Sequence, residues 1–187
     1  MSSERKINLN TFGMIYFTIF FIAIAFNDEN PYLKFPKMDE SFSRIMFTDI
    51  GIGIVVGLMI VLISWVMTKK SAAFQRLLRD FQTLLGPLSM TEIFFIAAFS
   101  SVAEEFFFRG LLQDKLGIVL ASLFFGALHT GPGKKYIPWT VFAVVMGFVL
   151  GGLYQWRENL ILPVVVHFVV NFVNLYLMGK TQAPVEL

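Results

Sequence analysis

Long apolar runs alternate with short polar segments along the chain, and six of these runs are candidates for membrane-spanning helices. They cover residues 12–26, 50–67, 91 to about 109, 116–128, 137–154 and 160–178. A hydrocarbon core of about 30 Å takes roughly 20 apolar residues of helix, so the first and fourth runs are short for a span. The pattern predicts an all-α fold, a polytopic transmembrane helical bundle of about six spans.

Residues 72–85 have a different pattern, in which basic and apolar positions alternate. Such a segment is typical of an amphipathic helix that lies in the membrane interface. Gly86 and Pro87 break this helix. Ser89 and Glu92 then have the spacing of a capping box, in which each side chain bonds the backbone N–H of the other residue. We therefore predict an interfacial helix, followed at once by the start of the third span.

The predicted spans fall into two groups. Residues 27–49, between the first two spans, are polar and mixed in charge, and they predict an external loop. This loop, the two spans beside it and the basic amphipathic helix form an expected N-terminal region, residues 1–90. The other four spans form an expected core, residues 91–180, which contains the candidate catalytic residues.

Basic residues indicate which side of the membrane is cytoplasmic. With six spans, the short basic segments all fall on one side; they contain Arg5, Lys6, Lys69, Lys70, Arg76, Arg79, Lys134, Lys135 and Lys180. Lys and Arg are enriched in cytoplasmic loops, so we expect a multi-pass protein of the cell membrane with both termini in the cytoplasm. The Ala23-Ile24-Ala25 sequence also resembles a signal-peptidase site, so cleavage of the first run as a signal peptide stays open.

Composition narrows the classes of function. Of the 187 residues, 56% are hydrophobic and 15% are charged, against roughly 45–50% and about 25% in soluble domains, which excludes a soluble enzyme. There is no cysteine, so disulfides, thiolate metal sites and cysteine nucleophiles are excluded. The net charge of +2 gives no indication of a nucleic-acid partner. The lipid bilayer is the partner that composition itself implies.

Several ionisable residues nevertheless fall inside the predicted spans. The third span contains Glu104, Glu105 and Arg109, the fourth ends at His129, and the sixth contains His167. Placing a charge at the centre of a membrane helix costs at least about 2.5–3.5 kcal/mol on insertion scales. We expect such residues to have partners in the bundle, a functional role, or both.

Helix periodicity sorts these residues by face. Glu105 and Arg109 are four apart and can neutralise each other as an ion pair, whereas Glu104 points about 100° away and lacks that partner. Burial disfavours the charged form of an unpaired carboxylate, which suits Glu104 to general acid–base chemistry. His167 and Asn171 are likewise four apart and share a face. Counting helical rise puts Glu104 and His167 at similar depth, with His129 nearer the cytoplasmic side.

Each feature also has a purely structural interpretation. The Glu105–Arg109 pair is typical of a structural ion pair, and a single intramembrane histidine is typical of an interhelical hydrogen bond. Glycines of the fifth span, Gly147, Gly151 and Gly152, indicate close helix packing. Function is favoured by the convergence of four residues on one possible water-activating site: Glu104, His129, His167 and Asn171.

Three motifs together resemble those of the CPBP family, which comprises CAAX prenyl proteases of the Ras-converting type and bacteriocin-processing or self-immunity enzymes. Residues 103–110, Ala-Glu-Glu-Phe-Phe-Phe-Arg-Gly, resemble its Glu-Glu-x-x-x-Arg signature. Residues 125–129 resemble its Phe-x-x-x-His motif, and residues 167–171, preceded by 159–163, resemble its His-x-x-x-Asn motif. The resemblance covers about residues 91–177, and the motifs occur in the family's order.

The resemblance implies a glutamic-type intramembrane endopeptidase that cleaves a membrane-associated protein or peptide, near its C-terminus. Carried onto matching positions, Glu104 would be the general base and His129 would position the water. His167 and Asn171 would stabilise the oxyanion of the tetrahedral intermediate. The supporting residues would be Glu105, Arg109 and Phe125, which lies four residues before His129 on the same helix face.

Other interpretations of the same residues stay open. Two histidines and a glutamate can bind zinc, but asparagine is a poor zinc ligand and the chain has no His-Glu-x-x-His motif, so we expect no metal and no cofactor. A non-enzymatic immunity or binding protein of the same fold is a second alternative. An ion-coupled transporter is a third, although two similar halves with interrupted helices are absent from the sequence. Oligomeric state, prenylation of the substrate and its side of entry stay open.

Overall fold

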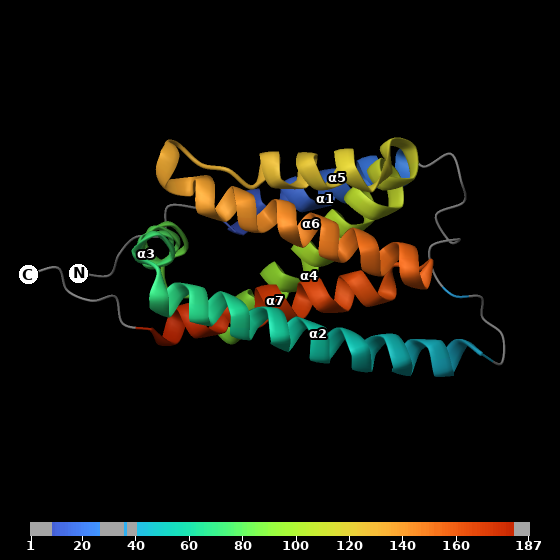
Figure 1. Ribbon diagram of the computed structural model, residues 1–187, viewed down its shortest axis with the longest axis horizontal. Helices are drawn as coiled ribbons and strands as arrows, with labels where there is room; N and C mark the ends of the chain where they lie inside the picture. Colours follow the sequence, from blue (N-terminus) through green and yellow to red (C-terminus); the bar gives the residue numbers. More distant parts are fainter. Residues whose placement is uncertain (1–8, 27–35, 37–40, 182–187) are drawn as a thin grey trace, which may run out of the picture.

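The computed structural model describes residues 9–26, 36 and 41–181, and all regular elements in these residues are helical. They are α1 (Leu9–Ala25), α2 (Phe42–Lys70), α3 (Ala72–Leu85), α4 (Met90–Phe107), the π-helical η2 (Phe108–Gln113), α5 (Asp114–Leu128), the 3₁₀ turn η3 (Lys134–Tyr136), α6 (Ile137–Arg157) and α7 (Ile161–Lys180). All but α3 run back and forth along the long axis, and α3 lies across one end (Figure 1). The expected all-α bundle is confirmed.

The number of spans fits the expectation approximately. In the described residues, four helical stretches are long and apolar enough to cross a membrane: Phe42–Lys70, Met90–Leu128, Lys134–Arg157 and Ile161–Lys180. The apolar helix Leu9–Ala25 is shorter. The stretch Met90–Leu128 is not straight, because Gly117 has φ 78° and ψ 166° and interrupts the helix. The chain crosses the bundle in α4 and returns in α5 (Figure 1), so α4 and α5 are two passes.

The second span begins earlier than the sequence predicts. It starts at Phe42, so Asp49 lies inside α2 and is fully buried, and its assignment to the external loop is wrong. The reason is a local network: Arg157 Nε donates to Asp49 Oδ1 at 2.7 Å and Asn159 Nδ2 donates to Asp49 Oδ2 at 2.9 Å. A carboxylate with two such donors is stable inside the bundle. The remainder of the expected loop is mostly in residues 27–35 and 37–40, which lie outside the described residues, as do Arg5 and Lys6.

The amphipathic helix α3 has the bounds that the sequence predicts. It ends at Gly86, whose φ of 63° favours glycine, and the predicted capping box then opens α4 through Ser89 and Glu92. Two contacts hold α3 across the end of the bundle. Gln82 Nε2 donates to the carbonyls of Met178 and Thr181 at 2.9 and 2.7 Å, at the C-terminal end of α7, where helix carbonyls lack internal partners.

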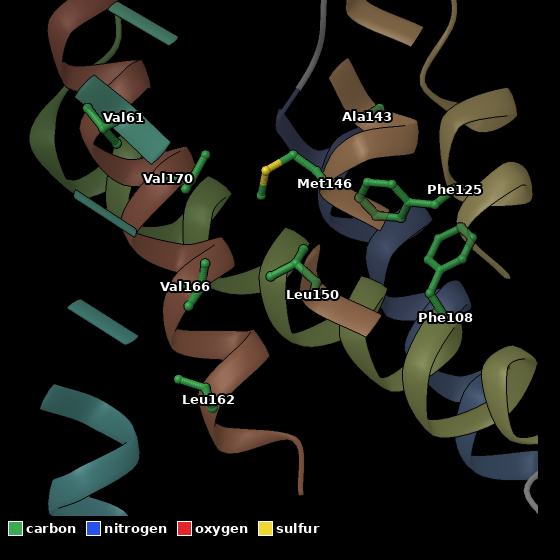
Figure 2. Packing of buried hydrophobic residues seen from close by; sticks show 9 residues of the cluster. All are labelled: Val61, Phe108, Phe125, Ala143, Met146, Leu150, Leu162, Val166 and Val170. Atoms are coloured by element: carbon green, nitrogen blue, oxygen red, sulfur yellow. The ribbon is translucent and has the colours of Figure 1, made fainter. Parts of the chain in front are cut away.

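Close packing of the long helices forms the core. Figure 2 shows a cluster of buried side chains at its centre, namely Val61, Phe108, Phe125, Ala143, Met146, Leu150, Leu162, Val166 and Val170. Glycines allow the close approach: a Cβ on Gly147 would lie 2.8 Å from Ser122 Cα, and one on Gly57 would lie 2.7 Å from Val169 Cβ. Gly152 does not contribute, since a Cβ there would meet no atom within 4 Å.

The described basic segments lie at one end of the bundle. The end of α2, all of α3, the α5–α6 connection and the end of α7 meet there (Figure 1). Lys135 Nζ contacts Asp80 Oδ2 at 2.6 Å across this end, joining η3 to α3. We refer to it as the basic end. Its assignment to the cytoplasm, and the division of the chain at residue 90, stay predictions.

Candidate active site

A buried ion pair in the middle of the bundle organises the site. Glu105 is fully buried and Arg109 is 1% exposed. Arg109 Nη1 donates to Glu105 Oε1 at 3.1 Å, and Arg109 Nε lies 3.1 Å from Glu105 Oε2. The guanidinium also donates to the Gly147 carbonyl of α6 at 3.2 Å and lies 4.7 Å from the ring centroid of Phe125. The pair expected from four-residue spacing is therefore present, and it joins α4, η2, α5 and α6.

Directly after the glutamates, the helix widens into a π turn, η2, which the sequence analysis did not foresee. Its last residue, Gln113, donates through Nε2 to the Gly151 carbonyl at 2.9 Å. A Cβ on Gly151 would lie 2.6 Å from Gln113 Oε1 and 2.9 Å from Ile118 Cγ1, so glycine gives both side chains room at this point. Arg109 and Gln113 thus fix η2 to successive turns of α6. Single π turns inside α-helices are frequent at functional sites.

His167 of α7 lies against the same carboxylate. Its Nδ1 is 2.7 Å from Glu105 Oε1, and a carboxylate oxygen accepts, so Nδ1 carries the hydrogen. This orients the ring, so that Nε2 lies 3.9 Å from Glu104 Oε2. His167 is only 5% exposed. Its hydrogen bond to Glu105 fixes the orientation of the imidazole ring.

His129 approaches from the opposite side, at the end of α5. Its Nδ1–H donates to the Phe125 carbonyl at 2.7 Å, its ring stacks on that of Phe125 at 4.3 Å, and its Nε2 lies 3.5 Å from Glu104 Oε2. The depth that the sequence suggests for His129 is corrected by the shape of α5. The helix restarts after Gly117 and is only about 16 Å long, and it brings His129 Nε2 to 3.5 Å from Glu104 Oε2.

Glu104 lies between the two imidazoles. It is 5% exposed, and within the described residues its Oε2 has no hydrogen-bond partner. Both Nε2 distances exceed an ordinary hydrogen bond. Tyr16 of α1 lines the same cavity as Glu104, and it is not among the site residues that the sequence predicts. The signal available was a phenol hydroxyl within an otherwise apolar span.

Asn171 lies one helical turn beyond His167 and is oriented by a different residue. Its Nδ2 donates to Ser100 Oγ at 2.9 Å. Ser100, four residues before Glu104 on α4, was also missed, although its spacing places it on the face of Glu104. The structure therefore brings Glu104, His129 and His167 within 4 Å and places Asn171 beside them without direct contact to Glu104.

These residues line one end of a cavity of about 370 Å³. The opposite end is lined by apolar side chains of α3, including Phe74, Leu77 and Phe81. The cavity thus reaches from the middle of the bundle to its basic end. Its size is in the range of cavities that bind small molecules or short peptide segments.

Within the described ranges, no group of three or more His, Asp or Glu side chains has an arrangement that would hold a metal ion. The donors that converge are Nε2 of His129, Nε2 of His167 and Oε2 of Glu104, while Asn171 is turned toward Ser100. Zinc ligation by three such donors stays an alternative that metal analysis can test.

The chain matches a protein-family model and a curated protein, and it matches no solved structure. Residues 86–173 match the family model described as "Rce1-like: Type II CAAX prenyl endopeptidase Rce1-like". "Uncharacterized protein YpbD" of Bacillus subtilis (strain 168) is 39% identical over 87 residues, which are 46% of this chain and 44% of that protein. The match thus spans under half the length of this curated relative. The matched segment contains all seven candidate site residues, and the expected resemblance to the CPBP family is confirmed.

Proposed function

Since residues 86–173 carry the Rce1-like segment of the CPBP family, we propose that this multi-pass membrane protein is an intramembrane endopeptidase that hydrolyses a peptide bond with water activated by Glu104. The observation that carries the proposal is the position of Glu104 Oε2. This buried oxygen has no hydrogen-bond partner in the described residues and lies 3.5 and 3.9 Å from two imidazole Nε2 atoms, and the Glu104 residue is part of the cavity lining. A neighbouring carboxylate, Glu105, is already paired with Arg109.

The proposed reaction begins with a water molecule between Glu104 and His129. His129 Nδ1 carries a hydrogen, so its Nε2 lone pair can accept a hydrogen bond from one O–H of the water and orient it, while that proton stays on the water oxygen. Glu104 takes the other proton as the water oxygen attacks the carbonyl carbon of the peptide bond. Glu104 then gives this proton to the departing amide nitrogen. The C–N bond breaks, and the products are a carboxyl group and an amine.

Two residues of α7 are placed to stabilise the oxyanion. The role proposed for His167 requires a hydrogen on Nε2 as well as on Nδ1. A doubly protonated His167 keeps its bond to Glu105 and donates Nε2–H to the oxyanion. Asn171 uses one amide hydrogen on Ser100 and has a second for the same oxygen. Removing one such donor costs about 10²–10³-fold in rate in other proteases.

The proposed substrate is a membrane-associated protein or peptide. The cavity is apolar toward α3, which suits a polypeptide segment that arrives from the membrane interface at the basic end. Cleavage near the substrate's C-terminus is part of the proposal and rests on the family resemblance.

Comparative peptidomics of membrane and secreted fractions tests this function. We expect Glu104→Gln to remove specific cleavage products that the wild type generates, with normal amounts of protein in the membrane. Glu158→Gln, at an exposed position on the α6–α7 turn, is the matched control and should leave the products unchanged. Identical peptide profiles for the wild type and Glu104→Gln would contradict proteolysis and favour a binding or immunity function.

A zinc-dependent version of the protease is the alternative left from the sequence, although no three of the described His, Asp and Glu side chains are arranged to hold a metal ion. It predicts stoichiometric zinc in the purified protein and loss of activity with a chelator. Activity of protein that contains no metal would exclude it.

A further inference from the structure

A second polar group lies in the cavity, away from the site already described. Asn174 of α7 and Ser64 of α2 both line it. Ser64 Oγ lies 3.0 Å from Asn174 Oδ1 and 2.9 Å from the Val61 carbonyl oxygen. Both oxygens are acceptors, but a serine hydroxyl has only one hydrogen. Ser64 therefore cannot satisfy both of them at once.

Whichever of the two oxygens accepts the hydrogen of Ser64, hydrogen-bonding groups of the Asn174 side chain stay unused. If Ser64 donates to Asn174 Oδ1, both amide hydrogens of Asn174 stay available. If Ser64 donates to Val61, the amide can turn over and donate Nδ2–H to Ser64 Oγ, which leaves its carbonyl and one hydrogen available. Among the described contacts, Ser64 is the hydrogen-bond partner of the Asn174 side chain. In either case Asn174 offers hydrogen bonds to a molecule in the cavity.

The position of Asn174 relates it to the cleavage site. His167, Asn171 and Asn174 are spaced i, i+4 and i+7 on α7 and all line the cavity, so they form one polar stripe. The helix rises about 10 Å from His167 to Asn174. An extended peptide advances about 3.3 Å per residue, so the same distance is covered by about three residues.

The chemistry of the stripe favours a polypeptide over a hydrocarbon chain. A side-chain amide has a donor and an acceptor side by side, as a peptide group does, and two such groups can pair. The walls beside the stripe are apolar and include Trp65, Leu175 and Met178. An amide without a partner is unfavourable in such surroundings, so a ligand that supplies main-chain N–H and C=O groups is preferred there.

We propose that Asn174, held by Ser64, is a substrate-binding residue that pairs with a peptide group of an extended apolar polypeptide, about three residues from the bond that is cleaved. The distance to the cleaved bond rests on the proposed function. Binding of the polypeptide to the stripe does not depend on cleavage.

A binding experiment on the full-length Glu104→Gln protein in nanodiscs tests this proposal. The probe is a short fluorescein-labelled peptide of leucine and alanine, together with versions in which one backbone N–H at a time is replaced by N-methyl. We expect one N-methyl position to weaken binding about tenfold, as loss of one hydrogen bond predicts. Adding Asn174→Leu should weaken binding of the parent peptide about tenfold and abolish the effect of that N-methyl position.

Three controls separate this interaction from altered folding. Thr18→Val removes an exposed hydroxyl that bonds its own helix, outside the cavity, and should leave binding unchanged. Ser64→Ala should weaken binding by less than Asn174→Leu, because the amide remains but is less well held. A fluorescein-labelled dodecyl chain should bind equally with and without Asn174→Leu, and thermal unfolding is measured for each variant.

The outcomes separate this proposal from proteolysis. Failure of the parent peptide to bind, or an equal effect of N-methylation with and without Asn174→Leu, would overturn it. Coupling between Asn174 and one N-methyl position supports it even if Glu104→Gln leaves the cellular peptides unchanged, in which case the protein binds polypeptides without cutting them. Loss of cleavage products in Glu104→Gln, without coupling to Asn174, would refute the subsite alone.

Discussion

Among the residues that the structure describes, two buried carboxylate clusters join helices of the bundle, and they differ in what their carboxylates face. One joins α2 to the α6–α7 turn: Asp49, fully buried, accepts from Arg157 at 2.7 Å and from Asn159 at 2.9 Å. The other lies in the middle of the bundle, where Glu105, also fully buried, is paired with Arg109. Considered alone, each pair is a structural element that joins helices.

The central cluster differs by having a second carboxylate. At Asp49 one acid faces one base, both carboxylate oxygens have donors, and none of the three residues lines the cavity. In the centre, Glu104 is added to a pair that is already balanced, and it faces two imidazoles and the cavity. We therefore interpret the Asp49 cluster as architectural and propose that the additional acid, Glu104, takes part in the chemistry.

Removing the central guanidinium should have the largest effect on folding. Arg109→Met leaves Glu105 buried without its cation, and breaking a buried pair on one side typically costs about 3–5 kcal/mol. We expect this loss of unfolding free energy in denaturant titrations of the protein in bilayer-like micelles. Unfolding at the wild-type denaturant concentration would show that the central pair is not needed for the fold.

Neutralising the other carboxylate should have a smaller effect and should spare activity. Asp49→Asn retains the shape of the side chain, and Arg157 is 25% exposed, so its charge can reach polar surroundings. The expected loss is about 1–3 kcal/mol, the typical cost of one impaired buried hydrogen bond. Denaturant titration gives the loss, and the cleavage rate of the remaining folded protein should equal that of the wild type. A large fall in that rate would remove the distinction between the two clusters.

A third ion pair lies nearer the surface, and we expect it to contribute least to stability. Asp80 and Lys135 join α3 to η3, and the hydrogen bond from Lys135 lowers the pKa of Asp80 below its usual value of 3.8. Because this pKa is lowered in the folded protein, the contribution to stability is present at neutral pH, above the unfolded value. It is lost as the pH falls through the lowered pKa. The same contact raises the pKa of Lys135 above 10.5, so on the alkaline side the contribution is lost only above that value.

Asp80→Asn should therefore change the stability of α3 docking only slightly, since exposed ion pairs contribute little. Hydrogen exchange of α3 amides at neutral pH is the measurement. We expect faster exchange in the variant and a smaller difference from the wild type at high salt. Exchange that is unaffected by both the substitution and salt would show that Gln82 and the apolar face alone hold α3.

The sequence predicts the parts of the site that depend on one helix. Spacing alone pairs Glu105 with Arg109 and leaves Glu104 apart, because helix periodicity is a local property. The capping box at Ser89 and the bounds of α3 are local in the same sense, and both are found.

Features that depend on contacts between helices were not foreseen. Asp49 looks like a loop residue until Arg157 and Asn159, far along the chain, are seen to bind it. Tyr16 shares a cavity with Glu104 because α1 packs against α4. The depth of His129 depends on the interruption at Gly117, which a single glycine in an apolar run does not reveal. Periodicity fixes the face of a residue, but the offset between helices comes from packing.

The central claim, that Glu104 is the acid available for chemistry, is tested most directly with purified protein in nanodiscs and a peptide identified as a cellular product. The rate of cleavage and the denaturation midpoint are measured together for the wild type, Glu104→Gln and Asp49→Asn. The account predicts that Glu104→Gln lowers the rate by about 10²–10⁴-fold, as loss of a general base does, while the protein stays folded. It predicts the reverse for Asp49→Asn, with lower stability and an unchanged rate. Cleavage by folded Glu104→Gln at the wild-type rate would contradict the account.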